Sequence, residues 1–183
     1  MSRPIYLDHA ATSYPKPPAV MAAMIDCMKH RGGNPGRGSH ILSLEAAREI
    51  YACREVAAGM FGAEADRVIF TLNTTHALNL AIKGVMGQGG HVICSDMEHN
   101  SVYRPLCRLA GEGKLTFDTF STFPASPQRT DDMILSSLIT KLRPDTRLVI
   151  CAHASNVCSA TLPIRKIGAL CRRLGILFAV DAA

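Results

Sequence analysis

From about residue 66 onward, short apolar runs alternate with longer segments of helical periodicity. The apolar runs are residues 68–70, 91–94, 115–117, 147–151 and 175–181. The segments between them with apolar residues at helical spacing are 74–86, 100–111, 132–143 and 163–174. Strands and helices that alternate at this spacing predict a mostly parallel sheet with helices on its faces. The expected fold class is therefore α/β.

The first sixty residues carry a different pattern. Residues 5–7 form a short strand-like run, and helices are predicted over 17–31 and 42–61, with Gly62 as the stop of the second helix. Between the two helices, residues 32–40 hold four glycines and one proline. We expect residues 1–40 to form an N-terminal arm, helix and glycine-rich loop, and residues 41–183 to form an incomplete α/β large domain.

The last apolar run has a direct bearing on function. Residues 175–181 are typical of a buried parallel strand, and the strand delivers the carboxylate of Asp181 at its carboxyl end, with only Ala182 and Ala183 behind it. Ligands of α/β sheets bind just outside such carboxyl ends. We therefore expect the chain to be the first part of a larger enzyme, with a truncated sheet.

Composition and cysteine usage narrow the class of protein. Hydrophobic residues make up 48% of the 183 residues and charged residues 19%, which is typical of a globular chain. The seven cysteines are an odd number without a C-x-x-C pair. This usage favours reduced thiols in a cytoplasmic protein over a disulfide scaffold or a metal site.

Membrane and nucleic-acid partners are not expected. No apolar run reaches the ~18–20 residues that cross a bilayer, and no basic end followed by an apolar region marks a secretory signal. The net charge of +5 is mild and spread along the chain. An anionic ligand or plain solubility explains this charge better than a nucleic-acid partner does.

Polar side chains come directly after four of the predicted strands. In chain order they are Thr74 and Thr75, His99, Asn156, and Asp181. In a parallel sheet such positions share one edge, so we expect one common site. A helix that opens with two threonines suits a phosphate group, because its first amides are free and the hydroxyls add donors. The simpler alternative for the threonines is a helix cap.

Together these residues have the chemistry that pyridoxal phosphate requires. The threonines suit its phosphate, His99 offers a ring neighbour, and Asn156 offers an amide donor. Asp181 supplies a carboxylate that can hold the proton on the ring nitrogen, and the protonated ring then serves as an electron sink. The predicted cofactor is therefore pyridoxal 5'-phosphate.

The chain also resembles a known family over nearly its whole length. The motifs that carry the resemblance are IYLDHAAT at 5–12, GNPGRG at 33–38, SDMEHNS at 95–101, HASNV at 153–157 and VDAA at 180–183. In order and spacing they are similar to the class V aminotransferase fold, and within it to cysteine desulfurases and selenocysteine lyases. The resemblance implies the large domain of a fold type I, aspartate aminotransferase-like enzyme that depends on pyridoxal phosphate.

The resemblance also implies roles by position. Thr74 and Thr75 would hold the cofactor phosphate, and His99 would stack on the ring and assist proton transfer. Asn156 would donate to the phenolic oxygen of the ring, and Asp181 would pair with the ring nitrogen. The implied substrate is L-cysteine, whose sulfur passes to an enzyme cysteine and on to iron–sulfur cluster assembly or another acceptor. The family further implies a homodimer.

Some positions depart from the family, and some of its residues are missing. Ala183 would pack under the ring. Three other positions depart from the family, which usually has Glu where His76 stands, often Asn where His9 stands, and Gly where Ser159 stands. Its cofactor-binding lysine, its reactive cysteine and its substrate-binding arginine are expected beyond residue 183. The 183 residues alone are therefore expected to be inactive. Alternatives are another class V activity, such as selenocysteine lyase or aminotransferase, and an inert fragment or interaction module.

One further expectation concerns association. The glycine-rich loop at 32–40 contains Arg37 and His40. Such loops are more often simple turns, so a role here rests on the resemblance. We expect the loop to lie near the cofactor pocket or the dimer seam of the intact enzyme.

Overall fold

The computed structural model describes residues 5–9, 11–38, 40–123, 125–158 and 160–183. The chain divides into two compact units, Met1–Phe70 and Thr71–Ala183, which we call the N-terminal and the C-terminal unit. The predicted division between residues 1–40 and 41–183 concerns the intact enzyme and stays a prediction.

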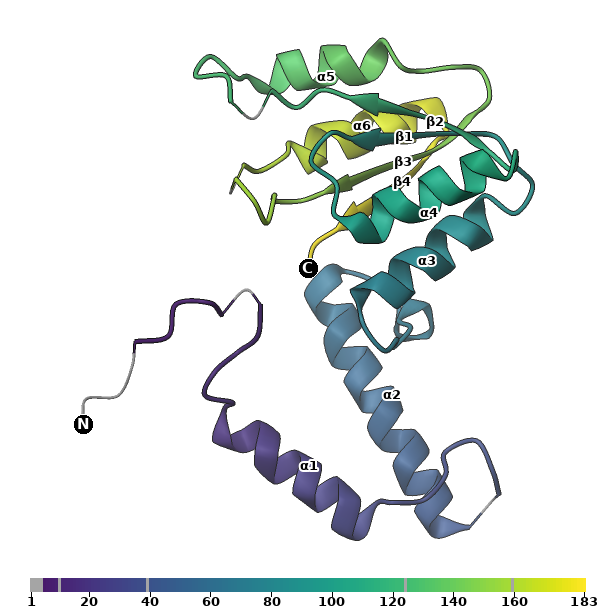
Figure 1. Cartoon of the computed structure of the whole chain (residues 1–183). Coiled ribbons are helices and arrows are strands. Elements are labelled where there is room, and N and C mark those ends of the chain that lie inside the picture. The colour runs from purple at the N-terminus through teal and green to yellow at the C-terminus, as the bar shows by residue number, and fades with distance from the viewer. Residues whose placement is uncertain (1–4, 10, 39, 124, 159) are drawn as a thin grey trace. The chain divides into compact units, whose positions relative to one another are not determined.

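The N-terminal unit contains two helices and a short 3₁₀ turn. These are α1 (Pro18–His30), α2 (Ile41–Phe61) and η1 (Ala65–Arg67) (Figure 1). Both helices lie where the sequence predicts them. Gly62 ends α2 with a φ of 62°, a left-handed conformation that glycine adopts without steric cost. At the other end of α2, the ring of His40 accepts a hydrogen bond from the amide of Ser43 at 3.3 Å.

Two strand-like runs of the sequence are not strands in this unit. Residues 5–7 and 68–70 have no strand conformation, and Ile5, Leu7 and Ile69 are between 76% and 87% exposed. A strand is stabilised by a ladder of hydrogen bonds to a neighbour, and neither run has one among the described residues. The strand prediction was wrong for both, because an apolar tripeptide indicates a tendency toward burial but not a pairing partner.

The C-terminal unit is built on a four-stranded sheet that is parallel throughout. Its strands are β1 (His91–Ser95), β2 (Thr116–Phe120), β3 (Thr146–Ala152) and β4 (Leu177–Asp181), in the order β2-β1-β3-β4 (Figure 1). β4 begins two residues later than predicted. Gly175, with a φ of 67°, still belongs to the turn that ends the preceding helix.

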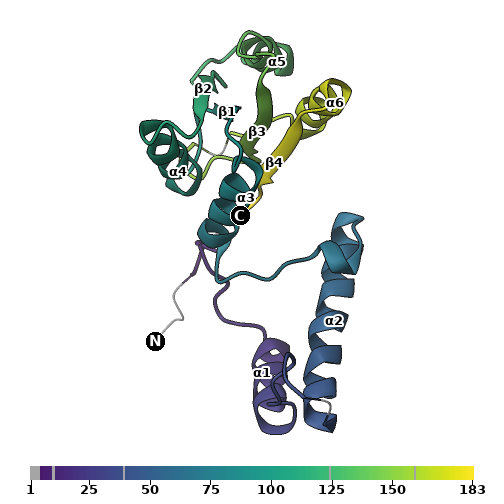
Figure 2. The same ribbon diagram turned by 90° about the vertical axis from the view of Figure 1, so that its right-hand side faces the viewer.

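Helices cover both faces of this sheet, as predicted. α3 (Thr74–Val85) and α4 (Asn100–Gly111) lie on one face, and α5 (Asp131–Ile139) and α6 (Ile164–Leu174) lie on the other (Figure 2). The alternation of strand residues explains the two layers. Val92 and Cys94 pack under α3 and α4, whereas Ile93 between them packs under α5 and α6. None of the described helices has the length and apolar character needed to cross a membrane.

Candidate functional site

The carboxyl ends of three strands meet at one edge of the sheet. Ala152 at the end of β3 pairs with Asp181 at the end of β4, and the amide of His153 donates to the carbonyl oxygen of Asp181 at 2.7 Å. β1 ends beside them at Ser95, and its loop leads to His99, the residue that precedes α4. The structure therefore places the predicted site residues His99 and Asp181 at this edge. His99 follows β1 and Asp181 ends β4, the two strands that neighbour β3 on either side.

Neither threonine at the start of α3 caps the helix. The side chain of Asn73 caps the helix and accepts a hydrogen bond from the amide of His76 at 2.9 Å. Thr74 and Thr75 follow as the first two helical residues, and both are exposed. The alternative that the threonines cap the helix is therefore wrong. Amides at such positions have no acceptor within the helix, and together with two hydroxyls they suit a phosphate.

A chain of hydrogen bonds connects the start of α3 to the start of α4. The hydroxyl of Thr75 lies 2.8 Å from the hydroxyl of Ser101, which lies 2.6 Å from Nδ1 of His99. The amide of Ser101 also donates to Nδ1 at 3.1 Å, so His99 caps α4 with its ring. The structure thus brings Thr75 and His99 together. The sequence assigned no role to Ser101, and its contact with Thr75 is identified only by the packing of α3 against α4.

Glu98 is a second residue that sequence reasoning left without a role. One carboxylate oxygen accepts a hydrogen bond from the amide of Ala152 at 2.9 Å and another from the hydroxyl of Ser95. The carboxylate thereby ties the loop after β1 to the end of β3, where β1 no longer supplies a partner. Burial raises the pKa of Glu98, and the charge of nearby Asp181 raises it further, against the two hydrogen bonds. In the sequence, only the position of Glu98 next to His99 indicates that it could belong to the site.

The remaining predicted residues follow β3 and β4. Asp181 is half-buried, and its Oδ1 accepts a hydrogen bond from the amide of Ala183 at 3.2 Å. Ala183 is exposed, and its packing under a cofactor ring stays a prediction. Asn156 lies in an exposed turn after β3, which is held by hydrogen bonds to the hydroxyl of the buried Ser155. The departure from the family at Ser159 lies outside the described residues.

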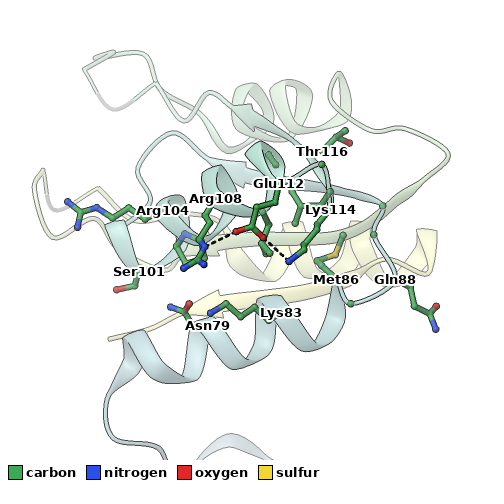
Figure 3. A pocket seen from close by; sticks show the side chains of 18 of the residues that line it. Asn79, Lys83, Met86, Gln88, Ser101, Arg104, Arg108, Glu112, Lys114 and Thr116 are labelled. Carbon is green, nitrogen blue, oxygen red and sulfur yellow. Dashed lines mark hydrogen bonds and ion pairs between the residues drawn. The ribbon is translucent and has the colours of Figure 1, made fainter.

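A broad groove runs between α3 and α4 away from this edge (Figure 3). Its volume of about 1460 Å³ exceeds that of a typical small-molecule pocket. Thr75, His99 and Ser101 line part of it. Elsewhere in the groove, Glu112 contacts Arg108 and Lys114 at 2.9 and 2.7 Å, and these partners hold the pKa of Glu112 down to about 2.

The three cysteines in the core are inert in this arrangement. Cys94 and Cys151 are buried within β1 and β3, and Cys171 is buried in α6. Burial raises the pKa of Cys94 to about 12 and that of Cys171 to about 11, and it raises the pKa of Cys151 as well. Because the thiolate is the reactive form, these buried thiols are unreactive core residues.

Cys158 should be alkylated much faster than the core thiols. It is exposed in the turn that contains Asn156, and a hydrogen bond with Ser155 is the main cause that lowers its pKa. We expect iodoacetamide at neutral pH to label Cys158 while Cys94 stays unmodified, as followed by peptide mass spectrometry. Ser155→Ala should slow the labelling of Cys158, and equal labelling of Cys94 in the folded protein would contradict the assignment.

The donors at this edge fit pyridoxal phosphate. The start of α3 offers free amides and two hydroxyls for a phosphate. The imidazole of His99, at the start of α4, is connected to Thr75 through the hydroxyl of Ser101. The carboxylate of Asp181 stands at the end of β4, where it can pair with a protonated ring nitrogen. The N-terminal loop at 32–40 belongs to the other unit, so its place near this pocket stays a prediction.

Comparisons with known proteins agree with this chemistry. Residues 5–183 match the family described as Aminotransferase class-V. The cysteine desulfurase IscS of Pectobacterium atrosepticum is 36% identical over 188 residues, which cover 100% of this chain and 45% of that protein. The chain thus spans a little under half the length of the curated relatives it matches.

Solved structures give the same result. The apo cysteine desulfurase of Thermococcus onnurineus NA1 matches with a TM-score of 0.84 and 29% identity, over 98% of this chain and 44% of that one. SspA in complex with cysteine matches with a TM-score of 0.85 and 27% identity, over 97% of this chain and 50% of that one. Since the family match extends over almost every residue, the chain belongs to the class V aminotransferase family, whose enzymes depend on pyridoxal phosphate.

Proposed function

We propose that the intact protein is a cysteine desulfurase that uses pyridoxal phosphate to convert L-cysteine into L-alanine. The observation that carries the proposal is the single edge of the sheet at which the Thr75–Ser101–His99 chain and the Asp181 carboxylate are gathered. Two of the proteins named above, from Pectobacterium atrosepticum and Thermococcus onnurineus, are cysteine desulfurases and support the choice of reaction within the family. The sulfur of the substrate passes to an enzyme cysteine as a persulfide.

In that reaction, the residues of this chain bind the cofactor and orient its ring. When bound, pyridoxal phosphate supplies an electron sink. Thr74 and Thr75 hold its phosphate at the start of α3, and Asp181 keeps the ring nitrogen protonated. Asn156 donates to the phenolic oxygen, and His99 lies against the ring and assists proton transfer. In this proposal, the cofactor-binding lysine and the reactive cysteine lie outside the 183 residues.

The proposal includes association and cellular context. We place the enzyme in the cytoplasm as a homodimer that delivers sulfur to an acceptor protein, such as one in iron–sulfur cluster assembly. Surface composition supports the dimer, because α1 has no buried residue and exposes Met21, Met24 and Met28. Seven free cysteines support a reducing compartment.

The reaction is tested by its products. With L-cysteine, pyridoxal phosphate and an added dithiol that reduces the enzyme persulfide, the enzyme in its full natural length should form alanine and sulfide, and the 183-residue chain should not exceed free cofactor. Thr75→Val should raise the dissociation constant for pyridoxal phosphate about tenfold or more, because it removes a hydrogen bond to a charged group. Thr75→Ser should retain binding, and Thr140→Val, at an exposed residue that ends α5, is the matched control.

Three results would contradict the proposal or a part of it. Turnover by the isolated 183 residues would show that the catalytic groups have been misplaced. Preferred release of selenium from selenocysteine, or amino-group transfer without alanine formation, would assign the protein to another class V activity. Unchanged cofactor affinity in Thr75→Val would remove the threonine from the phosphate site.

A further inference from the structure

Ser101 occupies a position between two parts of the candidate site. Its hydroxyl lies 2.8 Å from the hydroxyl of Thr75 on α3 and 2.6 Å from Nδ1 of His99 on the loop before α4. The side chain is buried, with 6% exposure, so water does not readily satisfy this hydroxyl. Its hydrogen bonds must therefore be made inside the protein, to one or both of these two neighbours.

The capping of α4 does not need the hydroxyl. The amide of Ser101 donates to Nδ1 of His99 at 3.1 Å, and any residue at this position would offer that amide. Because an amide can only donate, Nδ1 accepts, and a neutral His99 carries its proton on Nε2. The helix cap thus does not require the hydroxyl of Ser101. Because this hydroxyl nevertheless lies close to Nδ1, we consider a role for it other than the helix cap.

Two arrangements of the hydroxyl hydrogens keep the hydrogen bond between Thr75 and Ser101. Thr75 and Ser101 hold one hydroxyl hydrogen each. In the first arrangement, Thr75 donates to Ser101, and Ser101 donates to Nδ1 of His99. In the second, Ser101 donates to Thr75, and Thr75 donates to an acceptor outside the chain, so that Nδ1 keeps only the amide of Ser101.

An anion at the start of α3 selects the second arrangement. A phosphate offers acceptor oxygens, and hydrogen bonds to a charged acceptor are roughly twice as strong as those between neutral groups. It therefore draws the hydrogen of Thr75 away from Ser101. Ser101 keeps its hydrogen bond with Thr75 by donating to it, because Nδ1 of His99 is still satisfied by the amide of Ser101. Nδ1 of His99 thereby loses its hydroxyl donor.

We propose that Ser101 is a positioning residue that couples occupation of the phosphate site at the start of α3 to the hydrogen bonding of the His99 ring. Arrival of the phosphate group frees Nδ1 of His99 from the hydroxyl at the moment when the ring is needed beside the cofactor. The inference rests on the proposed function in one respect, because it takes the start of α3 as a phosphate site.

The coupling is tested by NMR with inorganic phosphate as the probe, at constant pH and without turnover. The amides of Thr74 and Thr75 report phosphate binding, and the imidazole nitrogens of His99 report the coupling. In the parent protein both sets of resonances should move with the same midpoint. In Ser101→Ala the amides should still respond, with a dissociation constant raised about two- to tenfold for one lost hydrogen bond, but the response of His99 should be lost.

Two further variants separate the coupling from a general effect on the fold. Ser101→Thr keeps the hydroxyl and should restore the response of His99. Ser136→Ala removes an exposed hydroxyl from α5 and should leave every response unchanged.

The possible failures are distinguishable. If His99 in Ser101→Ala follows phosphate as strongly as in the parent protein, the effect passes through space and the role of Ser101 is refuted. If the amides respond but His99 of the parent protein does not, the coupling alone is refuted. If the amides of Thr74 and Thr75 ignore saturating phosphate, the phosphate site of the proposed function fails and the inference falls with it.

Discussion

Replacing Asp181 by asparagine should lower kcat/KM for L-cysteine by about 10- to 150-fold in the full-length enzyme. This range corresponds to the loss of one charge-assisted hydrogen bond of about 1.5–3 kcal/mol. Asparagine keeps the shape of aspartate and an oxygen that can accept from the amide of Ala183, a contact of 3.2 Å in the structure. It cannot hold a proton on the ring nitrogen, so the loss should appear in the reaction and not in the fold.

The matched control for this substitution lies at the opposite edge of the sheet. Asp145 is exposed just before β3, so Asp145→Asn removes the same charge far from the carboxyl ends of the strands. Alanine formation at several cysteine concentrations, together with thermal unfolding, separates activity from stability. Equal activity of Asp181→Asn and Asp145→Asn would show that Asp181 does not contact the cofactor.

Sequence patterns within single segments predicted an element well where its backbone hydrogen bonds lie within that element or where it buries a continuous apolar face. Helices α3 and α4 begin at the predicted residues, because apolar periodicity and polar first residues are both local features. The run 68–70 is as apolar as β1 but forms no strand. Strand pairing is a tertiary property, and a short run does not identify its partner.

The candidate site shows the same limit at the level of side chains. The positions of His99 and Asp181 at strand ends follow from topology, since the carboxyl ends of parallel strands share an edge. Ser101 and Glu98 act through contacts to Thr75 and Ala152, which are 26 and 54 residues away in the chain. No local pattern encodes such contacts, so only the packed structure reveals them.

Truncating Ile150 to alanine should lower the free energy of unfolding by about 2–5 kcal/mol. Ile150 is fully buried in β3, which pairs with β1 on one side and β4 on the other, and it packs in the layer under α3 and α4. Removing its side chain leaves a cavity that the rigid sheet cannot fill by shifting. Ile139→Ala is the matched control, because Ile139 is 51% exposed at the end of α5 and should change stability by no more than about 0.5 kcal/mol. Urea unfolding followed by circular dichroism measures both, and equal losses would mean that the layer under α3 and α4 does not dominate the stability of this unit.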